Sequence, residues 1–136
     1  KNIKNLLYNK NYKMVVIKNE KVLFTSFDRG IKPIFDLQNE INHNEIENSF
    51  IGDRVIGKAA ALILSNLKIK GIYSELISKD ALNIFINNNI EVSYKRKVDK
   101  ILNRTKTGLC PIEKMSQYED NVDKLLKNIE IFLDEL

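Results

Sequence analysis

The sequence predicts an α/β fold, a three-layer α/β/α sandwich built on a mixed sheet of about five strands. Strand-like apolar runs alternate with segments of helical periodicity, which is the pattern of a sheet covered by helices on both faces. The two first strand-like runs flank a short polar turn, so an antiparallel hairpin opens the sheet. The chain has 136 residues, of which 43% are hydrophobic. This length fits a single domain, residues 1–136.

Five short apolar runs bounded by turn residues predict the strands. They are residues 14–17, 22–27, 49–51, 71–77 and 90–94. The polar turn at residues 18–21 joins the first two as an antiparallel pair. The later strands alternate with helices, which indicates that this part of the sheet is parallel and buried on both faces.

Apolar residues at helical spacing predict the helices. They are residues 33–41, 55–67, 79–87 and a C-terminal segment from Cys110, with a further helix before residue 12. Pro33 fits a first helical turn, and Ser78 is a good N-cap. The apolar stripe of the last helix becomes regular only after Tyr118. Residues 42–48 are polar and are expected to form a loop.

Positive charge is concentrated in residues 95–106, although the formal net charge of the chain is only +4. The basic residues of this stretch are Lys95, Arg96, Lys97, Lys100, Arg104 and Lys106. Nucleic-acid-binding surfaces interleave such residues with stacking aromatics, and only Tyr94 stands beside them here. A nucleic-acid-binding module is therefore the weakest of our function hypotheses.

The longest apolar run, residues 59–64, is much shorter than the roughly 20 residues of a membrane span. The sequence does not open with a positively charged region followed by an apolar stretch, so we do not expect a secretory signal. The single cysteine, Cys110, excludes an intrachain disulfide. We expect a cytoplasmic protein with no membrane partner.

Residues 52–58, Gly-Asp-Arg-Val-Ile-Gly-Lys, match the start of a phosphate-binding P-loop. Ala59 follows where a serine or threonine should hold magnesium. Val55 and Ile56 are β-branched and resist the backbone geometry of a phosphate-binding nest. The match therefore does not predict a nucleoside triphosphatase.

The same segment still suggests an anion site. Asp53, Arg54 and Lys58 would flank a helix N-terminus, where backbone amides favour anionic ligands. The alternative is an ordinary turn in which Gly57 serves packing.

A zinc site is not expected, although His43-Asn44-Glu45 and residues 110–113 partly match the zinc deaminase signature. Glu113 stands at the second cysteine position, and the proline follows Cys110 instead of preceding it. Too few zinc ligands remain to close a tetrahedral site. We therefore expect no metal and no cofactor, with His43 in a solvated loop.

Residues 103–113 form the least generic stretch of the chain. Its polar loop carries Asn103, Arg104, Thr107 and Gly108. Pro111 fits the first helical position, which leaves Cys110 near the N-cap with Glu113 three residues on. A thiol there is a candidate nucleophile, because helix amides stabilise a thiolate, and the alternative is a thiol that only caps the helix.

Three segments together resemble a known family. They are Gly-Asp-Arg-Val-Ile-Gly-Lys-Ala-Ala-Ala at 52–61, Ile-Tyr-Ser-Glu-Leu-Ile-Ser at 72–78 and Thr-Gly-Leu-Cys-Pro-Ile-Glu at 107–113. The chain resembles the bacterial and archaeal domain of unknown function 1893, from about Met14 to the final helix. The resemblance implies a cytidine-deaminase-like fold without the zinc ligands. The family positions carried over are Asp53, Arg54, Gly57, Lys58, Asn103, Arg104, Thr107, Gly108, Cys110, Pro111 and Glu113.

Two function hypotheses follow. In the first, the chain is a metal-free binding domain for a nucleotide-like or other anionic small molecule. The ligand-binding residues would be Asp53, Arg54, Lys58, Asn103, Arg104, Thr107 and Gly108. In the second, it is a group-transfer enzyme with Cys110 as the nucleophile and Glu113 or Asp53 moving protons. Whether it is an enzyme, and whether it forms a homodimer, stay open. Both hypotheses require the turns at 53–58 and 107–113 to lie side by side.

Overall fold

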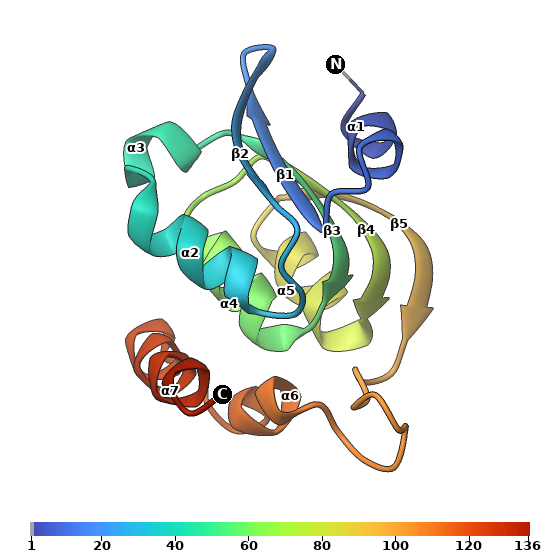
Figure 1. The fold of residues 1–136 in the computed structure, drawn as a ribbon, viewed down its shortest axis with the longest axis vertical. Helices are drawn as coiled ribbons and strands as arrows, with labels where there is room; N and C mark the ends of the chain where they lie inside the picture. The colour runs from blue at the N-terminus through green and yellow to red at the C-terminus, as the bar shows by residue number, and fades with distance from the viewer. Residues whose placement is uncertain (1) are drawn as a thin grey trace.

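Five strands form one mixed sheet in the order β2-β1-β3-β4-β5 (Figure 1). The structure, a computed structural model, describes residues 2–136. β1 is antiparallel to both β2 and β3, whereas β3, β4 and β5 are parallel to one another. The strands are β1 (Met14–Lys18), β2 (Lys21–Ser26), β3 (Phe50–Ile56), β4 (Gly71–Ser78) and β5 (Glu91–Val98). The predicted hairpin and the predicted parallel region are both confirmed.

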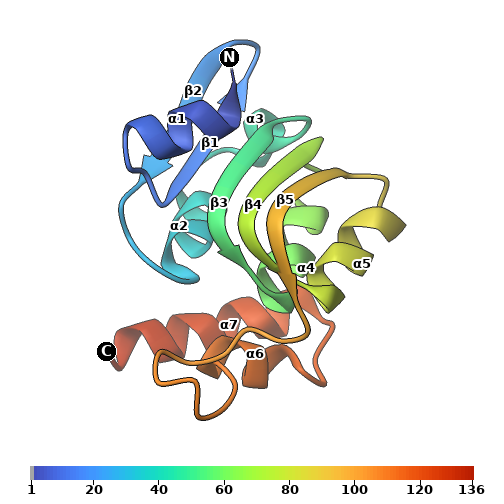
Figure 2. The ribbon, with the colours of Figure 1, turned by 90° about the vertical axis from the view of Figure 1, so that its right-hand side faces the viewer.

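Helices cover both faces of the sheet (Figures 1 and 2). α1 (Ile3–Asn9) packs on one face, and the other helices lie on the opposite side or beyond the carboxyl ends of β3–β5. These are α2 (Lys32–Glu40), α3 (His43–Ile46), α4 (Lys58–Asn66), α5 (Lys79–Asn87), α6 (Pro111–Ser116) and α7 (Val122–Asp134). The described helices include none with the length and apolar character needed to cross a membrane. The predicted α/β fold with helices on both sides of a five-stranded sheet is confirmed.

Alternating side chains of β1 fill the core on both sides of the sheet. Met14 and Val16 pack into the larger cluster beneath α2, α4 and α5, and Val15 and Ile17 pack into the smaller cluster beneath α1. This alternation follows from the two-residue period of a strand. Because both faces are covered, the strand is apolar along most of its length.

The starts of two helices were predicted correctly from local capping residues. Pro33 occupies the first turn of α2, and the Ser78 hydroxyl accepts a hydrogen bond from the backbone amide of Ala81 at the start of α5. The helix expected before residue 12 is α1. Such signals act within a few residues, which is why the sequence alone was sufficient for them.

Three expectations about local structure are wrong. The polar segment 42–48 contains the short helix α3, whose start is capped by the Asn42 side chain. β3 does not stop at Ile51 but continues to Ile56, because it hydrogen-bonds to β1 on one side and β4 on the other. The C-terminal segment forms two helices, α6 and α7, instead of one.

The longer β3 removes the turn that was expected at residues 53–58. Asp53 and Arg54 lie within the strand, and α4 begins only at Lys58. The segment that matches the start of a P-loop motif therefore forms the end of a strand followed directly by a helix. The five consecutive positions before Gly57 are β-structure, with no amide nest among them.

Candidate functional site

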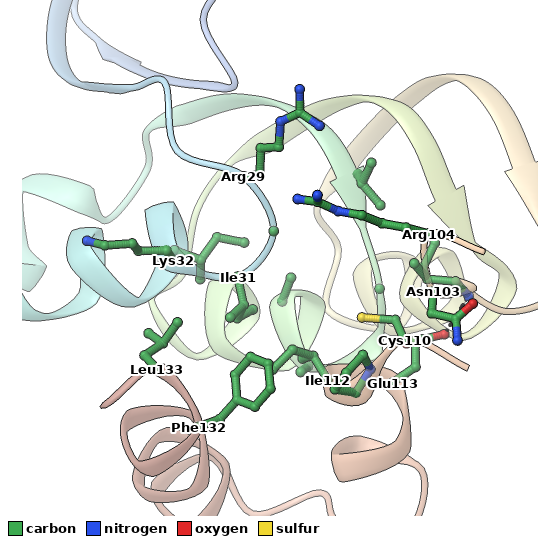
Figure 3. Close-up of a pocket in the computed structure, with 18 of the residues that line it drawn as sticks. Arg29, Ile31, Lys32, Asn103, Arg104, Cys110, Ile112, Glu113, Phe132 and Leu133 are labelled. Carbon is green, nitrogen blue, oxygen red and sulfur yellow. Dashed lines mark hydrogen bonds between the residues drawn. The ribbon is translucent and has the colours of Figure 1, made fainter. Parts of the chain in front are cut away.

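A cavity of about 540 Å³ lies beyond the carboxyl end of β3 (Figure 3). It is lined by residues 28–32 and 34 at the start of α2, by the start of α4, by residues 101–104 and 110–113, and by the end of α7. Open α/β sheets bind ligands beyond the carboxyl ends of their parallel strands, and small-molecule sites have volumes of roughly 300–1,000 Å³. Most of its lining is apolar, contributed by Ile31, Ile34, Val55, Ala59, Ala60, Ile112, Phe132 and Leu133.

Two arginines that have no partner among the described residues line the same cavity. Arg29 and Arg104 are exposed, and neither forms an ion pair with another residue between 2 and 136. Lys32, which also lines the cavity, is paired with Asp36 at 2.7 Å. Figure 3 shows both guanidinium groups on one side of the cavity and the apolar residues of α7 on the other. A guanidinium group matches carboxylate and phosphate oxygens in charge and geometry.

The loop that carries Arg104 is held by its own side chains. The Asn103 Oδ1 accepts a hydrogen bond from the Thr107 amide at 3.0 Å, and its Nδ2 donates to the Thr107 Oγ1 at 3.2 Å. The backbone amide of Asn103 donates to the Gly108 carbonyl at 2.9 Å. Asn103, Thr107 and Gly108 therefore shape the loop, while Arg104 projects from it.

Glu113 ties the two predicted motifs together. Its Oε1 accepts from the Lys58 backbone amide at 3.1 Å, and its Oε2 accepts from the Ile101 amide at 2.8 Å. The expected adjacency of the two motifs is thus confirmed for Lys58 and Glu113. The N-terminus of α4, where we expected an anionic ligand, already holds a carboxylate of the chain itself.

Gly57 is needed because Glu113 comes so close. A Cβ at position 57 would lie 2.6 Å from the Glu113 Oε1, and its φ of −105° is open to any residue. Close approach, and not backbone freedom, therefore explains this glycine. The Lys58 Nζ forms an ion pair with Asp120 at 2.8 Å. Its charge is therefore balanced by a carboxylate just before α7.

Asp53 does not line the cavity. Its side chain is 4% exposed, its Oδ1 accepts from the Arg54 amide at 2.7 Å, and its Oδ2 is buried with no partner among the described residues. Burial raises the pKa of this carboxyl to about 8, and hydrogen bonds from the Arg54 and Val55 amides oppose that rise. The expected hydrogen bond from the Thr107–Gly108 loop to Asp53 does not form, and that expectation is wrong.

Arg54 lies on the other face of the sheet, beneath α1. Its Nε donates to the Tyr12 carbonyl at 3.0 Å, and its Nη1 pairs with the Glu75 carboxylate at 3.2 Å. The guanidinium carbon is 4.6 Å from the centre of the Tyr8 ring, and the Tyr8 hydroxyl donates to Glu75 at 3.0 Å. Arg54 therefore fastens α1 to the sheet and is separated from the cavity.

Cys110 does line the cavity, and Figure 3 shows its sulfur directed into it. The thiol is half-buried at the N-cap of α6, with Pro111 in the first helical turn. His43, in contrast, lies on α3 at the opposite end of the molecule from α6 (Figures 1 and 2). Within the described residues, no group of three His, Cys, Asp or Glu side chains is arranged to hold a metal.

Comparison with known proteins assigns the family. The model of a family described as domain of unknown function DUF1893 matches residues 2–133, so the chain belongs to that family. A crystal structure of a DUF1893 family protein from Thermotoga maritima superposes with a TM-score of 0.83 at 26% identity, covering 98% of this chain and 86% of that chain. No curated protein matches the sequence.

Proposed function

We propose that this chain binds an anionic small molecule, without a metal, in the cavity beyond the end of β3. The observation that carries the proposal is the pair of guanidinium groups of Arg29 and Arg104 beside an apolar cavity, neither of them paired with any residue from 2 to 136. Charged side chains normally find partners or point into solvent, and two of them at one cavity favour an anion. The mixed sheet with helices on both faces also agrees with the deaminase-like scaffold that the sequence resemblance implies.

In this proposal, the residues singled out from the sequence have three different roles. Arg104, with Arg29, contacts the ligand. Asn103, Thr107 and Gly108 hold the loop that presents Arg104. Lys58 and Glu113 join α4 to the segment that closes the cavity, whereas Asp53 and Arg54 support the sheet and α1.

The second candidate is group transfer at Cys110, and the direction of its sulfur into the cavity favours it. The proton carriers considered with it are less suitable. Both oxygens of Glu113 accept backbone amides, and Asp53 does not line the cavity. Ligand binding therefore has the stronger support.

The proposal is tested by thermal unfolding of the purified protein in a panel of small anions: phosphate, citrate, adenosine monophosphate and decanoate. We expect at least one to raise the unfolding temperature, because a ligand that binds only the folded state stabilises it. The double variant Arg29→Gln/Arg104→Gln should lose that rise, and Lys106→Gln, in the same loop but outside the cavity, should keep it. No response to any anion, or an equal response of both variants, would refute the proposal.

A further inference from the structure

We infer that the ligand of this cavity is an aliphatic-chain anion, with one acidic head group held by Arg29 and Arg104 and its hydrocarbon chain inside the cavity. This inference rests on the proposed function and deepens it by naming the class of ligand. It also sets aside the nucleotide-like ligand that the sequence suggested.

The wall opposite the arginines consists of hydrocarbon side chains. Figure 3 shows Ile112 of α6 and Phe132 and Leu133 of α7 on this side. Ile34 of α2 and Ala60 of α4 add further apolar lining. None of these side chains can donate or accept a hydrogen bond. A base or ribose placed against them would lose hydrogen bonds to water without replacement, which disfavours a nucleotide. A hydrocarbon chain loses nothing there and gains from burial.

The polar side chains of the lining are mostly occupied. Glu113 accepts two backbone amides, and Asn103 is bonded to Thr107. Lys32 is paired with Asp36 at 2.7 Å and with Asp28, the other carboxylate of the lining, at 3.8 Å. The two guanidinium groups are therefore the positively charged groups of the lining that form no ion pair with another described residue. Two guanidinium groups match one carboxylate or phosphate head, so the polar part of the ligand is small and the rest is apolar.

The chain length of the ligand gives the sharpest test. Hexanoate, octanoate and decanoate, each below its micellar concentration, are titrated calorimetrically into the wild-type protein. Burial of one methylene is worth about 0.8 kcal/mol, about fourfold in affinity, so each added pair of methylenes should tighten binding about 15-fold until the cavity is full. Decanol should bind more weakly than decanoate because it lacks the charge. Decyl phosphate in place of decanoate shows which head group is preferred.

Variants locate the head group. Arg29→Gln and Arg104→Gln should each weaken decanoate about tenfold or more, since a hydrogen bond to a charged group is lost, and should leave decanol unchanged. Lys106→Gln is the matched control, with the same loop and the same loss of charge. These exposed positions allow the variants to fold normally.

The outcomes separate the two proposals. Tightening with chain length, together with selective loss in the arginine variants, supports an aliphatic anion. Equal affinity for hexanoate and decanoate, or binding of adenosine monophosphate in preference to decanoate, overturns this inference and leaves anion binding at the cavity in place. Failure of every anion to bind overturns both.

Discussion

The Glu113 carboxylate joins two segments of the chain beside the cavity. One carboxylate accepts amides from two distant segments, at Lys58 and Ile101, and is 6% exposed. Buried donors left without an acceptor are costly, so a side chain that accepts fewer hydrogen bonds at this position should destabilise the fold. The position of its carboxylate also leaves no room for a side chain at residue 57.

Gly57→Ala should destabilise the protein by about 1–3 kcal/mol, because the new methyl group would collide with the Glu113 Oε1. Glu113→Ala should cost about 2 kcal/mol through its two orphaned amides. In the double variant the collision is absent, so the two losses should not add. Urea unfolding of the four proteins measures this coupling. Strictly additive losses would mean that the two residues act independently.

Asp53 should make stability depend on pH. The folded state holds its proton up to about pH 8, whereas the carboxyl in the unfolded chain releases it near its ordinary value of 3.8. The folded state therefore binds more protons in this window, and the free energy of unfolding falls as the pH rises from 4 to 8. Asp53→Asn removes the titrating group. Its stability relative to the wild type should increase with pH when both are unfolded in urea at pH 5 and pH 8. Parallel curves would contradict a buried, protonated Asp53.

At the scale of secondary structure, α1 is a short helix held by a polar cluster. Arg54 and Glu75 on neighbouring strands meet the Tyr8 ring and hydroxyl, and Tyr8 also contacts the Tyr73 hydroxyl at 2.8 Å. Burial, followed by the hydrogen bonds to Tyr73 and Glu75, raises the pKa of Tyr8. A helix of seven residues is not stable alone, so these contacts and the small apolar cluster beneath it keep α1 in place.

Arg54→Met should loosen α1 without affecting the cavity. The variant keeps an apolar stem but loses the bonds to the Tyr12 carbonyl and to Glu75. Hydrogen exchange should become faster in residues 3–9, and anion affinity should stay within about twofold of the wild type, because distant sites behave independently. If this variant lost anion binding while residues 3–9 stayed protected from hydrogen exchange, Arg54 would belong to the binding site after all.

The elements that the sequence predicted well are those with local causes. The opening hairpin, the Pro33 helix and the Ser78-capped helix each depend on a few neighbouring residues. The extent of β3 could not be predicted in this way. Its apolar residues continue at helical spacing into α4, and only the pairing with β1 and β4 shows that residues 53–56 are strand.

At the scale of the whole molecule, the cavity joins segments that are far apart in the chain. Residue patterns identified Arg104, Cys110 and Glu113, which line it, and predicted that the Lys58 and Glu113 segments would meet. Arg29 was missed because its position beside the cavity depends on the topology of the sheet. β2 runs in the same direction as β3, so the turn after β2 reaches the edge of the sheet where the cavity opens. The contribution of α7 likewise depends on tertiary packing.

Protection of Cys110 from alkylation tests the central proposal most directly, because its sulfur lies inside the cavity. The rate of labelling by iodoacetamide is measured with and without an anion that raises the unfolding temperature. We predict that labelling slows in proportion to occupancy in the wild type and in Lys106→Gln, and stays unchanged in Arg29→Gln/Arg104→Gln. An unchanged labelling rate in the wild type with the anion bound at saturation would place binding elsewhere and contradict the proposed site.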